Sequence, residues 1–244
     1  MAASPAATAP YRGFINDIDS QVVESIEGFL LLNPHCTRLD GGSEIKVVLR
    51  DEWQAESAQQ VALISGGGDG HAPSHAGFVG AGMLTAAVSG QVFASPSVKA
   101  VLAGIRAVAR PSAPSAASPG ALLIVKNYTG DRLSFGLAMS KAVLEGIPVE
   151  MVIVADDVTL PRSKGVTGRR GIAGTVLVHK IAGAAAAQGK PLAEVARLAE
   201  AAASSIVSIG IATSHCNVPG NVSDPARLPA GMMELGVSCR GQCA

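Results

Sequence analysis

The chain has 244 residues, of which 48% are hydrophobic and only 3% aromatic, so its core must be built mainly from Ala, Val, Ile and Leu. Lysine plus arginine and aspartate plus glutamate number 19 each, a balance that provides no overall field to attract nucleic acid or an anionic membrane. The four cysteines have the spacing of neither a disulfide framework nor a zinc ribbon. We therefore expect a protein of the reduced cytoplasm that binds a small molecule, with no nucleic acid and no membrane as partner.

The N-terminal end differs in composition from the rest of the chain. Residues 1–13 are rich in alanine and lack the apolar core of a signal peptide, which predicts a flexible tail. Residues 14–244 show neither an internal repeat nor a stretch with the composition of a linker between domains. This part is expected to form a single domain.

The first half of the chain predicts two or three helices and one strand. Residues 17–31 place apolar side chains at helical spacing, and Asp17 can cap that helix. The short apolar run VALIS at 61–65 is followed at once by glycines, as expected for a buried strand that runs into a glycine loop. Because Pro73 is tolerated only in the first turn of a helix, we expect a helix to begin near it. Residues 98–109 predict a further helix.

In the second half of the chain, predicted strands and helices alternate more regularly. The composition of 111–120 is that of a loop, and the apolar runs at 121–128 and 149–155 predict strands on either side of a helix around 133–145. Helices over 172–188 and 191–205 and a strand over 205–213 complete the pattern. Such alternation indicates an α/β fold with a parallel-rich sheet flanked by helices, whose ligand binds beyond the carboxyl ends of the strands.

The sequence SGGGDGHAPSHAG at 65–77 is the sharpest local feature. Three consecutive glycines allow the backbone to approach a ligand closely. The spacing is not that of a dinucleotide loop, because the third glycine position falls on His71 or Pro73. It is not a P-loop either, since the Gly-Lys pair in this chain is followed by Pro191. The loop is therefore expected to bind something other than a nucleotide phosphate.

Two histidines stand in this loop, four residues apart. Zinc-binding helices of similar spacing carry Glu after the first histidine, whereas this chain has Ala72 and then Pro73, so we expect no metal there. His75 is interpreted as a packing or capping histidine in the first helical turn. His71 is expected at a helix N-terminus, where the helix dipole disfavours the imidazolium and a neutral imidazole can act as a general base.

A second polar cluster, KNYTGD at 126–131, follows the strand predicted over 121–128. Lys126 and Asp131 are expected at the same edge of the sheet as the glycine loop, where they could orient hydroxyl groups or move a proton. The alternative is a solvated turn that contains an ion pair. The residues alone do not decide between these two interpretations.

Three stretches resemble the signatures of one family. Residues 63–96, 123–138 and 168–189 are similar, in order, to the substrate-binding (DhaK-type) subunit of dihydroxyacetone, or glycerone, kinases. The resemblance implies an ATP-dependent kinase of glycerol metabolism that phosphorylates dihydroxyacetone or related short carbonyl sugars. It also implies ATP-magnesium bound on a separate helical domain or subunit and no cofactor on this chain. The implied partner is a second copy of the chain, the helical nucleotide-binding kinase domain, or both.

The resemblance also implies roles for individual residues. His71 and Asp131 match the residues that transfer protons at the phosphorylated hydroxyl. A further family histidine, which binds the substrate carbonyl covalently, matches Arg240. The implied substrate-binding residues are Gly68, Asp69, Gly70, His71, Lys126 and Asp131.

Three departures from the family pattern bear on activity. Asp69 stands for the usual serine and Ala72 for the usual glutamate, and a carboxylate at Asp69 would raise the pKa of His71. Arginine stays protonated and is not a nucleophile, so Arg240 cannot form the covalent bond. The chain is thus expected to hold the first lobe of the domain without the second. A non-catalytic binding or regulatory subunit, or an inactive shortened product, remains the alternative to a kinase component.

Overall fold

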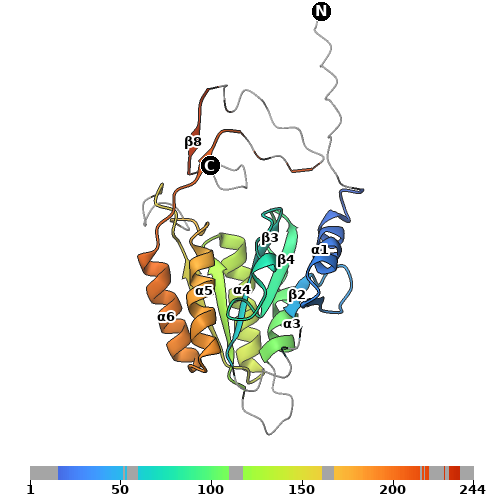
Figure 1. Ribbon diagram of the computed structural model, residues 1–244, viewed down its shortest axis with the longest axis vertical. Coiled ribbons are helices and arrows are strands. Elements are labelled where there is room, and N and C mark those ends of the chain that lie inside the picture. The colour runs from blue at the N-terminus through green and yellow to red at the C-terminus, as the bar shows by residue number, and fades with distance from the viewer. Residues whose placement is uncertain are drawn as a thin grey trace, which may run out of the picture.

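The computed structural model describes residues 16–51, 53, 60–109, 118–160, 168–214, 216, 218–219, 228 and 231–236. Within these ranges one sheet separates two layers of helices (Figure 1). The predicted tail over 1–13 lies outside the described residues, as does most of the loop predicted over 111–120. No helix in the described part of the chain is long and apolar enough to cross a membrane.

The main sheet confirms the predicted α/β class. Four neighbouring strands of the sheet run parallel to one another. The apolar residues of two of them, β3 (Ala62–Asp69) and β5 (Ala121–Lys126), are buried on both faces and pair in register from Ala62 with Ala121. Two short strands add an antiparallel edge that the sequence did not reveal. The strands, in spatial order, are β1 (Cys36–Arg38), β2 (Val47–Arg50), β4 (Ala86–Val92), β3 (Ala62–Asp69), β5 (Ala121–Lys126) and β6 (Val149–Val154).

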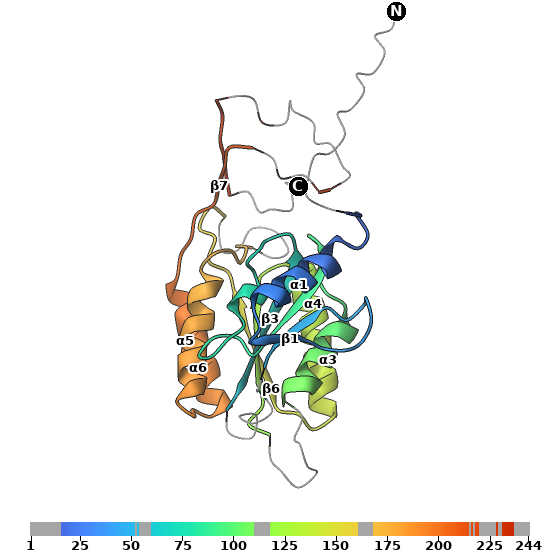
Figure 2. The same ribbon diagram turned by 45° about the vertical axis from the view of Figure 1, so that its right-hand side comes forward.

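Helices cover both faces of this sheet, as Figures 1 and 2 show from two directions. On one face α3 (Val98–Ala109) and α4 (Thr129–Leu144) pack around the fully buried Phe135. On the other face lie α1 (Gln21–Leu32), α5 (Thr175–Ala187) and α6 (Leu192–Ser205). The helix predicted over 98–109 agrees with α3 at both ends. The ends of the helices predicted over 17–31, 133–145, 172–188 and 191–205 differ from those of α1, α4, α5 and α6 by at most four residues.

The glycine segment corrects two expectations. The glycines do not form a loop after the strand, because β3 continues through them to Asp69. A Cβ on Gly66 would come within 2.2 Å of the carbonyl oxygen of Val88, so only glycine lets β3 and β4 lie this close. The helix predicted near Pro73 is wrong: a short 3₁₀ helix, η1 (Ala76–Phe78), stands there instead. Glycines at 77, 80 and 82 make a regular helix unfavourable.

Two further expectations, one near each end of the described chain, are also corrected by the structure. Asp17 does not cap α1; its carboxylate accepts the backbone N–H groups of Asp19 and Ser20, one turn before the helix. The strand predicted over 205–213 is reduced to β7 (Ile211–Ala212), which pairs with β8 (Glu234–Leu235) in a separate two-stranded sheet. Tertiary pairing rather than β-propensity decides how much of such an apolar run becomes strand.

Candidate active site

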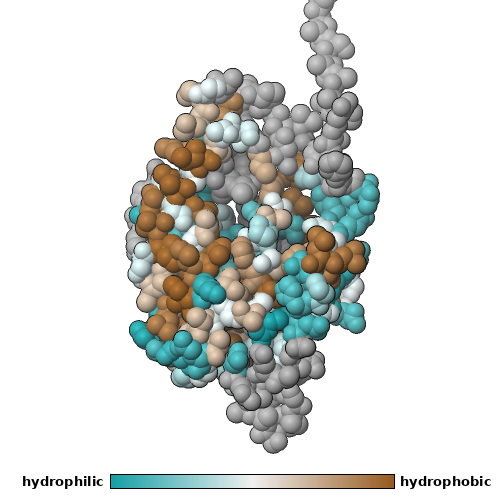
Figure 3. Space-filling model, viewed as in Figure 1, coloured by the Kyte–Doolittle hydropathy of each residue, from teal (hydrophilic) through white to brown (hydrophobic). Residues whose placement is uncertain are grey.

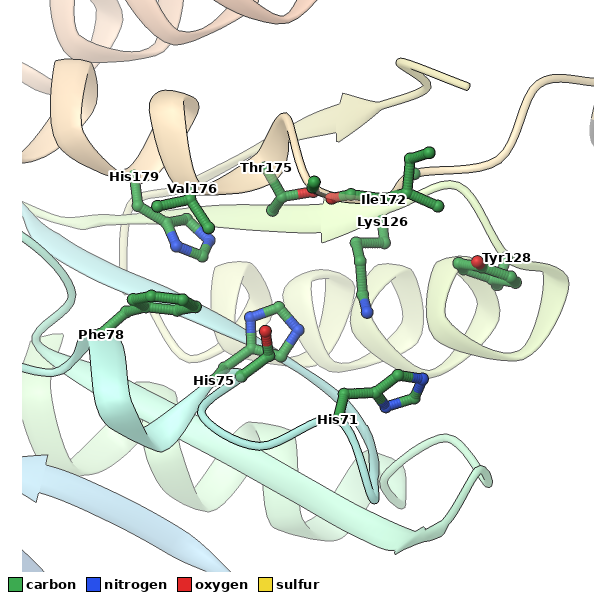
Figure 4. Close-up of a pocket in the computed structure, with 12 residues that line it drawn as sticks. His71, His75, Phe78, Lys126, Tyr128, Ile172, Thr175, Val176 and His179 are labelled. Carbon is green, nitrogen blue, oxygen red and sulfur yellow. Dashed lines mark hydrogen bonds between the residues drawn. The ribbon is translucent and has the colours of Figure 1, made fainter. Parts of the chain in front are cut away.

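A pocket of about 180 Å³ opens at the carboxyl ends of β3 and β5. The two strands pair in parallel up to Gly66 and Val125, so the residues that follow each strand emerge at the same edge of the sheet. His71 comes from the segment after β3, and Lys126 is the last residue of β5. Figure 4 shows the Lys126 side chain reaching down between the rings of His71 and His75.

His71 is held in one tautomer by its own loop. Its Nδ1 lies 3.0 Å from the carbonyl oxygen of Gly68, and since a carbonyl only accepts, Nδ1 carries the proton. The Nε2 atom of the neutral ring then has the lone pair. The edge-to-face contact with Phe93, at 5.2 Å between ring centroids, further fixes the ring. The half-buried imidazole is therefore built to accept a proton at Nε2.

His75 is buried and is oriented by a relay across the sheet. The Ser65 hydroxyl donates to the carbonyl oxygen of Ile124 at 2.7 Å, so its oxygen accepts from Nδ1 of His75 at 3.2 Å. This again leaves the lone pair on Nε2, for which the described residues provide no hydrogen-bond partner. Burial, and then the nearby positive charge of Lys126, lower the pKa of His75 well below its ordinary value. His75 is a packed, buried side chain, as one of the two interpretations predicted. Its side chain makes no capping hydrogen bond, and the residue belongs to no α-helix.

Lys126, His75 and Asp131 converge on Gly67. A Cβ placed on Gly67 would lie 3.7 Å from Nε2 of His75 and 3.8 Å from both Oδ2 of Asp131 and Cε of Lys126. Asp131 is only 1% exposed and stands in the first turn of α4, where the helix dipole favours a negative charge. Asp131 therefore lies in a buried turn of a helix and not in the solvated turn of the alternative interpretation. His71 lines the pocket itself, whereas Asp131 is not among the described residues that line it.

The opposite wall of the pocket comes from the segment that leads into α5. Asp156, just after β6, accepts the backbone N–H groups of Ile172 and Gly174 at 2.8 Å each, which anchors the start of that helix. Gly171 packs closely against the last residues of β5 and β6. A Cβ on Gly171 would lie 2.4 Å from the carbonyl oxygen of Val154 and 2.8 Å from Cα of Lys126. The close approach places the first two turns of α5 over the pocket.

His179 on α5 is the pocket residue that sequence reasoning missed. It is fully buried, and its ring centroid lies 5.6 Å from that of His75 and 5.8 Å from that of Phe78. Burial, and secondly Lys126, lower its pKa to about 3, so the ring is neutral. Neither of its ring nitrogens has a hydrogen-bond partner among the described residues. The available signal was a histidine in the largely apolar segment 172–188, which is predicted to be a buried helix.

The predicted substrate loop is divided between two cavities. Asp69 and Gly70 line a separate cavity together with Phe93, and Gly68 packs against the backbone of Phe93 and Ala94. The Asp69 carboxylate accepts the N–H of Gly70 at 2.7 Å, and burial raises the pKa of this carboxyl although His71 opposes that shift. Asp69 therefore interacts with His71 electrostatically, as expected, but does not face the same pocket.

Two further expectations receive no direct test. Arg240 lies outside the described residues. Over the ranges that the structure describes, no group of three or more His, Cys, Asp or Glu side chains is arranged to hold a metal ion. The absence of metal between His71 and His75 thus stays a prediction.

Comparison with known proteins gives a consistent result. The family model of the Dak1 domain matches residues 27–243. A putative 3,4-dihydroxy-2-butanone kinase of Solanum lycopersicum is 55% identical over 95% of this chain, and a dihydroxyacetone kinase of Citrobacter freundii is 48% identical over 94%. The crystal structure of the Citrobacter enzyme superposes with a TM-score of 0.85. The chain spans about 38–40% of the length of these two relatives.

A relative with a different role also has this fold. The dihydroxyacetone kinase operon co-activator Dha-DhaQ is 31% identical and superposes with a TM-score of 0.72, over 91% of this chain and 68% of that one. The same architecture thus occurs both in proteins named as kinases and in one named as a co-activator.

Proposed function

This chain belongs to the Dak1 domain family, and we propose on that basis that it is the sugar-binding part of a dihydroxyacetone (glycerone) kinase. The observation that carries the proposal is the pocket in which His71 presents Nε2 beside Lys126 at the ends of two parallel strands. Three of the similar proteins are named as a putative 3,4-dihydroxy-2-butanone kinase, a triokinase/FMN cyclase and a dihydroxyacetone kinase, names that point to short hydroxyketones or trioses as substrates of those proteins. The proposed substrate is accordingly dihydroxyacetone or a related short carbonyl sugar.

The arrangement suits transfer of a phosphoryl group to a hydroxyl. As the hydroxyl oxygen forms its bond to the γ-phosphorus of ATP, the bond from that phosphorus to the leaving ADP breaks, and Nε2 of His71 accepts the hydroxyl proton. The ammonium of Lys126 stabilises negative charge on the sugar oxygens. The buried Asp131, which lies near Gly67 together with Lys126, balances the charge of the protonated site.

The phosphoryl donor is proposed to be ATP-magnesium held by a part of the protein outside this chain. The Citrobacter kinase, of which this chain covers 40%, has a structure described as a complex with AMP-PNP and Mg²⁺. A partner is also consistent with the surface in Figure 3, where apolar residues gather on the side that carries α5 and α6. Its exposed members include Leu177, Ile181, Val207 and Ile209. We propose a second copy of this chain, a helical nucleotide-binding kinase domain, or both, in the cytoplasm.

The first test is binding. Calorimetric titration with dihydroxyacetone should show weak, saturable binding, because hydrogen bonds to a small hydrated sugar give little net affinity. Glycerol, which lacks the carbonyl, is the control ligand. His71→Asn should weaken the binding of dihydroxyacetone, and His35→Asn, at an exposed histidine elsewhere, should not. Absence of any dihydroxyacetone binding to the wild-type chain would contradict the proposed function.

A second candidate, a binding or regulatory protein without turnover, is favoured by Arg240 and by the similarity to the co-activator. Phosphorylation of dihydroxyacetone by ATP-magnesium, assayed with and without a helical nucleotide-binding kinase domain, separates the two, because only the kinase part should support turnover when that domain is added. Intact-protein mass spectrometry after incubation with dihydroxyacetone detects a covalent adduct. We expect no covalent adduct and no phosphorylation of the sugar by this chain alone. A reversible mass increase equal to the sugar would show that another residue has replaced the family's histidine.

A further inference from the structure

The residue after β4 has a backbone conformation that is unusual for a large side chain. Phe93 has a φ of 53°, and it is the one residue other than glycine with a positive φ in the part of the chain that the structure describes. The left-handed region is unfavourable for residues with a Cβ, because that atom crowds the neighbouring carbonyl oxygen. Strained residues of this kind persist where the surrounding structure holds them, and they gather at functional sites.

A bulge in β4 directly precedes Phe93. The register of β3 against β4 shifts between Gly67 and Asp69, where β4 has one residue more than β3. Such a bulge bends the strand and re-aims the side chains that follow it. The backbone N–H of Phe93 then donates to the carbonyl oxygen of Asp69 at 3.0 Å. Phe93 is therefore tied to the end of β3, the strand that leads to His71.

Two glycines at the end of β3 make room for Phe93. A Cβ on Gly68 would lie 2.7 Å from the carbonyl carbon of Phe93, and a Cβ on Gly70 would lie 3.0 Å from Cε1 of its ring. Neither glycine is among the described residues that line the pocket with His71. The absence of a side chain at both positions is thus explained by Phe93, independently of any contact with a sugar.

The ring that these glycines admit packs on His71. The two ring centroids are 5.2 Å apart and the ring planes are inclined by 68°, which is the geometry of an edge-to-face pair. Phe93 lines the cavity that also contains Asp69, and it is not among the described residues that line the pocket of His71. Its effect on a sugar in that pocket must therefore pass through the imidazole.

We propose that Phe93 is a positioning residue for the proton transfer at His71. Its ring keeps the imidazole turned so that Nδ1 donates to the carbonyl oxygen of Gly68 and Nε2 carries the lone pair. Without the ring, the imidazole would rotate away from Gly68, and the tautomer with the proton on Nε2 would become populated. The inference rests on the proposed function, because only a proton acceptor at Nε2 gives this orientation a use.

The first measurement detects the tautomer directly. Long-range ¹H–¹⁵N correlation spectra of the ¹⁵N-labelled full chain, at about pH 8 where an ordinary histidine is neutral, distinguish the two imidazole tautomers. The signals of His71 are those that disappear in His71→Asn. The wild type and Phe93→Tyr, which keeps the ring, should show the proton on Nδ1. Phe93→Leu should show both tautomers.

The second measurement is calorimetric titration of the same variants with dihydroxyacetone. Phe93→Leu should weaken binding about two- to tenfold, the equivalent of one aromatic pair, because a sugar hydroxyl donates to Nε2 of His71. Phe93→Tyr should bind as the wild type does. Phe29→Leu is the matched control, since Phe29 is a half-buried phenylalanine of α1 and should affect neither the tautomer nor the affinity.

A third variant separates positioning from packing. Glycine adopts a positive φ without strain, so Phe93→Gly removes both the ring and the strain, whereas Phe93→Leu removes the ring and keeps the strain. The two variants should lose the tautomer preference and the affinity to the same extent, although their Tm values differ. Losses that follow the Tm values instead would assign Phe93 to packing and overturn the proposal.

The outcomes also separate this inference from the proposed function. Failure of the wild type to bind dihydroxyacetone contradicts the proposed function, and the tautomer measurement still tests Phe93. An unchanged tautomer in Phe93→Leu contradicts the positioning role whether or not the sugar binds. Weaker binding together with an unchanged tautomer would mean that Phe93 contacts the sugar itself, which overturns the role assigned to it here.

Discussion

The two ends of the pocket use the same side chain, imidazole, under different conditions. At the outer end, His71 is half-buried and turns Nδ1 to a backbone carbonyl, beside a lysine and a tyrosine. At the inner end, His75 and His179 are buried against Phe78, and burial keeps them neutral. Solvent access and the partner of Nδ1 thus determine whether an imidazole can exchange protons with a reacting group or only offer hydrogen bonds.

The largest expected difference between the two ends concerns the chemical step. In this chain extended with the C-terminal part of the Citrobacter kinase and carrying Arg240→His, His71→Asn should lower kcat by about 10²–10⁴-fold, the usual contribution of a general base. The assay is phosphorylation of dihydroxyacetone by ATP-magnesium, with His35→Asn as control. A loss of less than tenfold would remove His71 from the proton transfer.

A substitution at Gly171 tests the packing of the segment that leads into α5 and forms one wall of the pocket. Gly171→Ala would bring a Cβ into the backbone of Val154 and Lys126, and relief of that overlap should cost about 1–3 kcal/mol of unfolding free energy. Urea unfolding measures this cost. Gly28→Ala is the control, because Gly28 lies in α1 with nothing within 4 Å of a Cβ, so alanine there should be neutral or stabilising. Equal stability of the two variants would contradict the close packing at Gly171.

Acid should destabilise the protein through the inner end. The pKa of His179 is about 3 in the folded chain and near 6.5 when unfolded, so between these values the unfolded state binds more protons. Stability therefore falls as the pH falls through this window, and His179 alone should cost about 2 kcal/mol by pH 5. His75 acts in the same direction.

Urea unfolding at pH 7 and pH 5 measures this effect. His179→Leu should lose less stability between the two pH values than the wild type, whereas His35→Leu should lose as much. Identical pH dependence in the wild type and His179→Leu would show that His179 is not buried and neutral.

The smallest expected effect is at the mouth of the pocket. The ammonium of Lys126 lies 5.9 Å from the ring centroid of Tyr128, and such a cation–π contact contributes about 0.5–1 kcal/mol. Tyr128→Leu should therefore weaken dihydroxyacetone binding two- to fivefold, by about that energy. Tyr128→Phe keeps the ring and should bind as the wild type does. If both variants weaken binding equally, the tyrosine hydroxyl is responsible instead.

Much of the fold was predictable because its central strands and helices have strong local patterns. The buried parallel strands β3 and β5 begin with continuous apolar runs, the edge strand β6 is apolar except for Glu150, and α3 has clear helical periodicity. The antiparallel strand β2 and the small-residue strand β4 went unpredicted, because short or alanine-rich segments become strands only through their pairing partners.

The candidate site was predictable in part for the same reason. Parallel strands bring their carboxyl ends to one edge, and this places His71 and Lys126 together from strand order alone. The segment after β3 was harder. Glycines that suggest a loop are here required by the close approach of β4, and no local pattern distinguishes these two uses.

The sequence by itself determined the α/β class, the family, and the position of His71 and Lys126 at the same edge of the sheet. Only the tertiary structure decided that Asp69 faces a different cavity and that Asp131 is buried. It also decided that His75 meets His179, because burial and pKa depend on contacts between α5 and the segment after β3, which are remote in sequence. Local periodicity records which face of an element is apolar, but not which distant polar group that element will meet.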